Sequence, residues 1–354
     1  MDRRNDFADI LRGISAYLVI LGHCLLSTGT AFGVSENGNG LLAVHIIYSF
    51  HMPLFMLLCG YFSEKSYKKH GGKLFVRNRI ISLIPPLITW SVIQVIWSLM
   101  EKEIIVGDIP RVFLLKFFSN YWFVWAVLIL SIGSVAIEKI YGEKALVAYV
   151  CIILLGFVTP DAVVNSSGVK FMLPYYVIGF KISQYAKSCI LPITQKLRKG
   201  NIHYIGIVIV LNLISVLICL YYPTEWLIHI SEISCINKDA ISQLTIDLGR
   251  YAAGLVNSMV FAVDIWLLYA RCVKKATKKW LIVLEPWIWS GKNSMGLYIV
   301  HYYILNYFAV RVIVGIGNFS IVTIILESIA VWGISAFVIQ IVNRMHGGRI
   351  LFGK

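Results

Sequence analysis

The chain has 354 residues, of which 58% are hydrophobic and only 14% are charged, and its formal net charge is +14. Soluble domains carry about 25% charged residues, so this composition excludes an ordinary soluble protein. Seven cysteines are scattered along the chain without the spacing of a zinc or redox site, and we expect neither disulfides nor a bound metal. The sequence therefore predicts an all-α integral membrane protein.

Ten apolar segments are candidates for membrane-spanning helices, each of which needs about 20 residues to cross a bilayer. If the N-terminus is cytoplasmic and the segments alternate, most of the 32 Lys and Arg residues fall in cytoplasmic stretches, among them 65–79 and 271–292. This bias follows the positive-inside rule and predicts about ten transmembrane helices with both termini in the cytoplasm. The basic excess is then a topology signal that needs no nucleic-acid partner. We expect one membrane domain over residues 1–354, with apolar segments at 7–28, 41–62, 80–100, 121–137, 145–158, 171–185, 204–222, 248–270, 294–314 and 319–342.

Two ionisable residues, Arg12 and His23, lie inside the first apolar segment, and the segment lacks a clear signal-peptide cleavage site. A charged group in hydrocarbon costs roughly 2.5–3.5 kcal/mol on insertion scales, so such residues usually face protein or a watery cavity. Eleven residues at about 100° each place both side chains on one helix face, separated by a rise of about 16.5 Å. Each residue alone is compatible with helix packing, but the shared face favours a functional site in which His23 is a general base. Asp9, three residues before Arg12, is placed to form a local ion pair.

Further candidate residues follow along the chain. Pro53 should interrupt the hydrogen bonding of the second helix, and His51 precedes it, as either a structural residue at a kink or a substrate-binding residue. Arg77 and Arg79 lie near the cytoplasmic end of the third segment, where they are either topology signals or a grip for phosphate. Trp122 begins the fourth segment, where it either belongs to an aromatic belt or stacks on a sugar. For His301, in the ninth segment, a helix–helix hydrogen bond is expected.

Several of these motifs occur in a characteristic order. They are the Arg12 and His23 pair, the phrase FHMPLF at 50–55 with GYF at 60–62, the two arginines before the prolines at 85–86, YWF at 121–123 and GLYIVH at 296–301. The ordered set resembles the signature of the membrane-bound acyltransferase-3 family. The second-segment phrase is similar to the branch described as fucose 4-O-acetylase-like.

The resemblance implies a ten-helix fold in the bacterial cell membrane that moves an acyl group, usually acetyl, from cytoplasmic acyl-CoA to a hydroxyl of a cell-surface or lipid-linked carbohydrate. Acetyl-CoA or another acyl-CoA is then a co-substrate, no cofactor is permanently bound, and membrane lipid is the remaining partner. By position, Arg12 and His23 match the family's catalytic pair. Arg77 and Arg79 match a basic pair that would hold the donor with Arg12, and His51 and Trp122 are candidates for acceptor binding. Since the sequence stops at Lys354, no appended hydrolase-like domain is expected.

Two other functions compete with this one. A transporter or flippase for a glycan or lipid-linked sugar would also contain buried charges and a broken helix. Transporters often show repeats with paired interrupted helices, and Pro53 has no clear counterpart in the second half of the chain. The second alternative is a non-catalytic partner in an envelope complex.

Overall fold

The computed structural model describes residues 6–34, 38–159, 166–185, 195–197, 202–221, 240–275, 278–306, 320–345 and 347–353. Within these ranges every regular element is a helix and none is a β-strand, which confirms the all-α class. Seven helical stretches in these ranges are long and apolar enough to cross a membrane. The number of ten spans and the cytoplasmic placement of both termini stay predictions.

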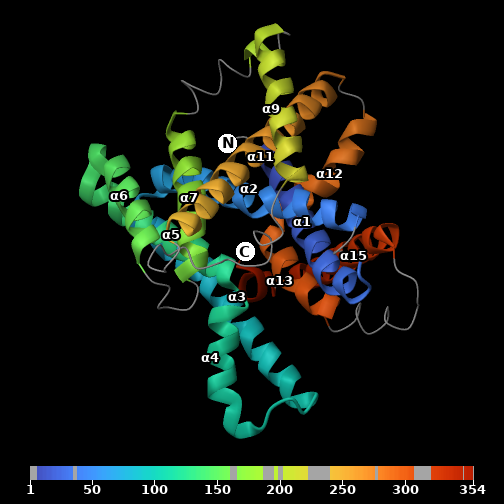
Figure 1. Ribbon diagram of the computed structural model, residues 1–354. Helices are drawn as coiled ribbons and strands as arrows, with labels where there is room; N and C mark the ends of the chain where they lie inside the picture. Colours follow the sequence, from blue (N-terminus) through green and yellow to red (C-terminus); the bar gives the residue numbers. More distant parts are fainter. Residues whose placement is uncertain are drawn as a thin grey trace. The chain divides into compact units, whose positions relative to one another are not determined.

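The helices coincide with most of the predicted segments. Helix α6 has the bounds predicted for the fifth segment, whereas α2 and α3 extend beyond the predicted 41–62 and 80–100. Their shared boundary is set by the backbone and not by apolarity, because Gly71 has a φ of 72° and separates them. Residue 222, residues 307–314 and residue 319, at ends of predicted segments, lie outside the described residues. The helices are α1 (Asp6–Cys24), α2 (Gly38–His70), α3 (Gly72–Met100), α4 (Ile109–Ser119), α5 (Trp122–Tyr141), α6 (Ala145–Val158), α7 (Ser166–Tyr185), α9 (Ile202–Leu220), α11 (Ala240–Lys275), α12 (Lys278–Lys292), α13 (Ser294–Ile304), α15 (Ile321–Arg344) and α16 (Gly348–Phe352) (Figure 1).

The chain forms two compact units, each built from several parts of the sequence. Unit 1 comprises residues 1–58, 185–229 and 250–341, and unit 2 comprises residues 59–184, 230–249 and 342–354. The prediction of one membrane domain over residues 1–354 stays a prediction.

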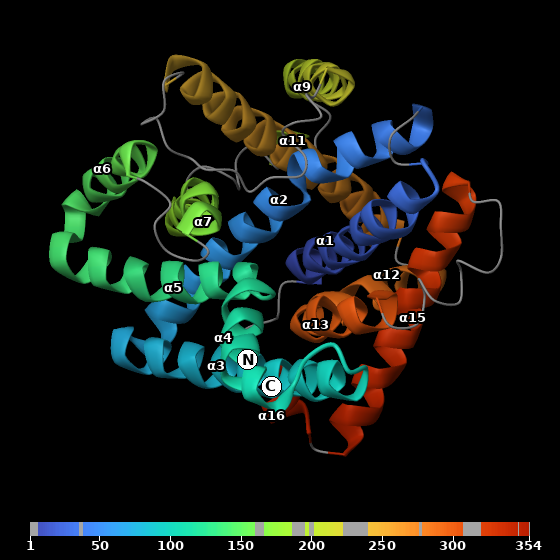
Figure 2. The same cartoon turned by 60° about the horizontal axis from the view of Figure 1, so that its bottom comes forward.

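Unit 1 is organised around α1, which lies along α12 and α13 (Figure 2). A Cβ added at Gly13 of α1 would collide with the carbonyl of Trp287 in α12, and a Cβ added at Gly291 of α12 would collide with the carbonyl of Asp9. Glycine at these two positions therefore lets the helix backbones touch, as small residues do in membrane proteins. The sequence assigns 271–292 to a cytoplasmic connection, but residues 278–292 form a helix that packs on α1.

Helix α2 continues through Pro53 without the expected interruption. Polar side chains of α11 reach the turn before the proline. Ser258 donates a hydrogen bond to the carbonyl of Phe50 at 3.2 Å, and the amide of Asn257 donates to the hydroxyl of Ser49 at 2.9 Å. Backbone groups that a proline disturbs need such partners where water is excluded. The proline thus marks a contact between α2 and α11 and not a gap in the helix.

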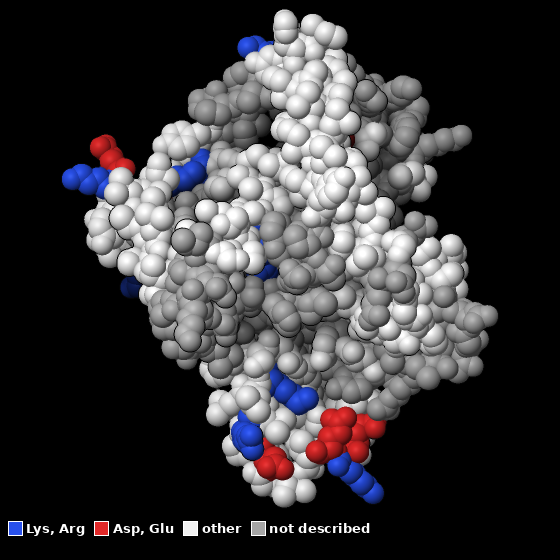
Figure 3. Space-filling view, in the orientation of Figure 1, with Lys and Arg blue, Asp and Glu red and all other residues white. Residues whose placement is uncertain are grey.

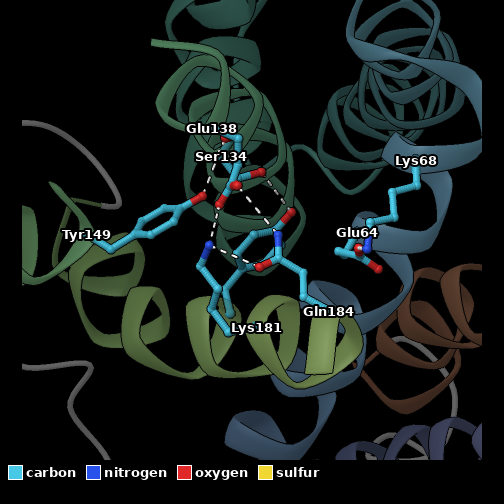
Figure 4. A network of polar contacts seen from close by, with 8 residues as sticks. Glu64, Lys68, Ser134, Glu138, Tyr149, Lys181 and Gln184 are labelled. Atoms are coloured by element: carbon cyan, nitrogen blue, oxygen red, sulfur yellow. Dashed lines mark hydrogen bonds and ion pairs between the residues drawn. The ribbon is translucent and has the colours of Figure 1, made fainter. Parts of the chain in front are cut away.

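Unit 2 contains a network of polar contacts among α2, α5 and α7 (Figure 4). Lys181 of α7 forms an ion pair with Glu138 of α5 at 2.8 Å and also donates to Gln184 at 3.1 Å. Close to it, Ser183 donates a hydrogen bond of 2.6 Å to the buried carboxylate of Glu64. Partnered charges of this kind are tolerated in low-dielectric surroundings, and they join the ends of three helices.

On the face that Figure 3 shows, most of the described side chains are uncharged, as expected for helices that contact lipid. Helix α9 illustrates this, because its many exposed side chains include Ile207, Ile209 and Leu213. A helix that is apolar all round is typical of a membrane span. In the same view of Figure 3, charged side chains gather at the lower end, where Figure 1 shows α4. The connection from α3 to α4 contains the exposed residues Glu101 and Glu103.

Candidate active site

The first ionisable group of α1 is paired within its own helix. Arg12 forms the predicted ion pair with Asp9, with a nitrogen–oxygen distance of 3.7 Å. The Asp9 side chain is only 2% exposed, whereas the Arg12 side chain is 21% exposed. Asp9 also lies in the first turn of α1, where the helix dipole favours a negative charge. The ion pair therefore anchors the guanidinium of Arg12 to α1, and part of the Arg12 side chain stays exposed at the surface of unit 1.

The second ionisable group of α1, His23, lies beside an imidazole from a distant part of the sequence. The rings of His23 and His301, the latter in α13, have centroids 5.3 Å apart and are inclined by 40°. His23 is half-buried, and His301 is 2% exposed. The position of His301 was recognised in the sequence, but its contact with His23 was not, because residue spacing carries no information on which helices touch.

The hydrogen bonding of His301 determines its tautomer. Its Nδ1 lies 2.7 Å from the carbonyl oxygen of Leu297, and a carbonyl can only accept, so Nδ1 carries the proton. In the neutral ring the other nitrogen, Nε2, then has a lone pair. This Nε2 is buried and has no hydrogen-bond partner among the residues that the structure describes.

His51 of α2 is the third imidazole of the cluster. It is 4% exposed, its Nδ1 lies 2.6 Å from the carbonyl oxygen of Ile47, and its ring packs against that of Tyr48 with centroids 4.9 Å apart. Tyr48 in turn lies beside the residue that precedes His23, because a Cβ added at Gly22 would meet the Tyr48 ring at 3.1 Å. Within the described part of the chain, no three His, Cys, Asp or Glu residues are arranged to hold a metal ion. The contact between His23 and His301 suits a hydrogen bond between the two imidazoles.

Just after His23, α1 changes from an α-helix into a π-helix over Leu25–Gly29. Short π-helical turns are frequent at functional sites. In this turn Thr28 donates a hydrogen bond of 2.9 Å to Oε1 of Glu327 in α15, and Glu327 is only 6% exposed. The sequence analysis did not single out Glu327. A lone carboxylate inside an otherwise apolar segment was the signal that would have identified it.

The remaining candidates lie in unit 2. Arg79 donates a hydrogen bond of 2.9 Å to Ser63 and lies over the ring of Phe75 at 5.1 Å, whereas Arg77 is exposed. Two positions along a helix correspond to about 200°, so the two arginines project from different sides of α3. Their joint role in binding phosphate stays a prediction. Trp122 is half-buried at the start of α5.

Comparison with known proteins gives an independent view of the chain. Residues 5–341 match the acyltransferase-3 family, which is described as an acyltransferase domain. The nodulation protein NolL of Mesorhizobium japonicum is 28% identical over 184 residues, which cover 50% of this chain and 47% of the relative. The nodulation protein NolL of Sinorhizobium fredii is 27% identical over 183 residues, which cover 50% of this chain and 48% of the relative. The chain thus spans about half the length of the curated relatives it matches. No solved structure matches it.

Proposed function

The chain belongs to the acyltransferase-3 family, and on that premise we propose that it is a membrane O-acyltransferase, specifically an O-acetyltransferase. The donor is cytoplasmic acyl-CoA, and the acceptor is a hydroxyl of a cell-surface or lipid-linked carbohydrate at the bacterial cell membrane. The observation that carries this proposal is the imidazole cluster around His23, on the same helix as the guanidinium of Arg12. Histidine is the side chain best suited to general-base work near neutral pH.

The reaction needs one proton-accepting group. A ring nitrogen of His23 takes the proton of the acceptor hydroxyl while the oxygen attacks the thioester carbonyl carbon. The new C–O bond gives a tetrahedral intermediate, and its collapse breaks the C–S bond. The leaving thiolate takes the proton back from the His23 imidazolium. The products are the carbohydrate ester and the free thiol of CoA, and no acyl-enzyme is required.

The donor is proposed to bind along α1. CoA has phosphates at one end and its thioester at the end of a long arm, and the rise from Arg12 to His23 is about 16.5 Å. Guanidinium groups bind phosphate through paired, charge-assisted hydrogen bonds, which suits Arg12 for this role. Arg77 and Arg79 are proposed as further donor-binding residues, and His51 and Trp122 as acceptor-binding residues. Each of these assignments is testable by replacement of that residue alone.

The reaction class is tested with the purified full chain in lipid nanodiscs. Incubation with acetyl-CoA and extracted surface glycan should release free thiol and increase the mass of the glycan by one acetyl unit, and empty nanodiscs serve as the control. A transporter or a non-catalytic partner would release no thiol above that control. Glycan from cells lacking the gene should contain fewer acetyl groups. If neither the thiol nor the ester forms with any glycan fraction of the host cell, the proposed reaction is wrong.

Replacement of Arg12 by glutamine is expected to weaken CoA binding about tenfold or more, because charge-assisted hydrogen bonds contribute about 1.5–3 kcal/mol. The dissociation constant of CoA, measured by calorimetry in nanodiscs, checks this result. Arg12→Gln should also lose most of the preference for CoA over its 3′-dephospho form. Arg344→Gln, at an exposed arginine, is the matched control and should bind CoA like the wild type. Equal CoA affinity in Arg12→Gln and the wild type would contradict the role of Arg12.

A further inference from the structure

We propose that His301 is a positioning residue for His23. In this arrangement Nε2 of His301 accepts a hydrogen bond from one ring N–H of His23, so that the other ring nitrogen of His23 is left as the base. The inference rests on the proposed function, because it gives His23 its place in the reaction, but the contact itself can be tested without any turnover.

His301 has an unused lone pair. Its Nδ1 is committed to the carbonyl of Leu297, and its buried Nε2 has no partner among the described residues. A buried acceptor without a partner loses its hydrogen bonds to water and gains none in return, so a donor is expected to reach it. In this tautomer the ring of His301 is neutral. Its Nε2 can accept a hydrogen bond but cannot donate one.

The ring of His23 is the neighbouring donor for Nε2 of His301. The His23 ring lies against that of His301 with centroids 5.3 Å apart, a separation that leaves about 3 Å between ring nitrogens that face each other, which is a hydrogen-bonding distance. His51 is placed differently, because its ring lies edge-on against Tyr48. Of these two histidines, His301 is the one whose ring meets that of His23 and whose buried Nε2 has no partner among the described residues.

The membrane surroundings of His23 favour an uncharged partner. In soluble enzymes a carboxylate commonly orients a catalytic imidazole by accepting its N–H. A carboxylate in hydrocarbon carries a large desolvation cost, whereas a neutral imidazole is a hydrogen-bond acceptor without a net charge. A second histidine therefore performs the orienting task at a lower cost inside a membrane helix bundle.

The test compares His301→Gln with His301→Leu in the full chain in nanodiscs. The amide oxygen of glutamine accepts a hydrogen bond and leucine does not, so kcat should fall about tenfold in His301→Gln and about 100-fold in His301→Leu. The KM for acetyl-CoA should stay within about twofold in both. Stability should follow the opposite order, because leucine suits an apolar site better than glutamine does. If kcat falls in the same order as the unfolding temperature, His301 is merely structural and the inference is wrong.

The matched control is Ile299→Val, at a fully buried position of the same helix. This variant should have a slightly lower unfolding temperature, and its kcat should stay within about twofold of wild type. A large loss of kcat in this control would show that α13 tolerates no disturbance, and it would remove the special role of His301.

A second readout measures the contact without substrate. Diethyl pyrocarbonate modifies an imidazole through its unprotonated nitrogen, and peptide mass spectrometry follows the modification of His23 by itself. The rate at His23 should fall severalfold in His301→Leu and recover in part in His301→Gln. Unchanged His23 labelling in both variants overturns the inference. If labelling depends on His301 but the wild type transfers no acyl group, the contact stands and the proposed function fails.

Discussion

Replacement of His23 by asparagine is expected to lower kcat by at least about 100-fold, the range associated with loss of a general base. Asparagine keeps a polar side chain of moderate size at a half-buried position, so the protein should still insert and fold. Because the proposed donor contacts lie elsewhere on α1, the dissociation constant of CoA should change little. Initial rates of thiol release, at equal amounts of monodisperse protein, check this expectation.

The control for this experiment is another histidine of the same unit. His203 lies exposed in α9, and His203→Asn should keep the wild-type kcat. A purified His23→Asn protein that turns over at the wild-type rate would remove the base assignment. If His23→Asn loses both CoA binding and turnover, the replacement has disturbed the structure of α1.

Replacement of Gly13 by alanine is expected to destabilise the protein by about 1–3 kcal/mol, the usual cost of forcing a methyl group into a packed site. The new Cβ would collide with the carbonyl of Trp287, so α1 and α12 must move apart. Gly291→Ala should have the same effect from the other helix. The measurements are the unfolding temperature in detergent and the fraction of protein that remains monodisperse.

The matched variant is Gly133→Ala in α5, where an added Cβ meets nothing within 4 Å. In open space the same change in a helix should stabilise the protein by about 0.4–1 kcal/mol, because the unfolded chain loses conformational freedom. The two glycine-to-alanine changes should therefore shift the unfolding temperature in opposite directions. Equal shifts would show that the backbones of α1 and α12 are not in contact.

Local features of α1 were predictable from the sequence. The Asp9–Arg12 ion pair follows from a spacing of three residues on one helix, and the structure confirms it. The α-helical class and the bounds of α6 follow from runs of apolar residues. The contacts of Ser258 and Asn257 with the turn before Pro53 were not predictable, because a separate helix supplies these polar groups.

The amino-acid sequence was enough to predict a helical membrane protein, and its ordered motifs indicated the acyltransferase-3 family. The length of the apolar runs predicts membrane helices, and the residue types at set spacings indicate the family. The packing of α12 on α1 and the contact of His301 with His23 became visible only in the folded chain. Apolar helices are alike in hydropathy, so hydropathy does not indicate which of them are in contact. Contact between two helices depends on small residues and side-chain shape at their crossing, and these are properties of the pair and not of either segment alone.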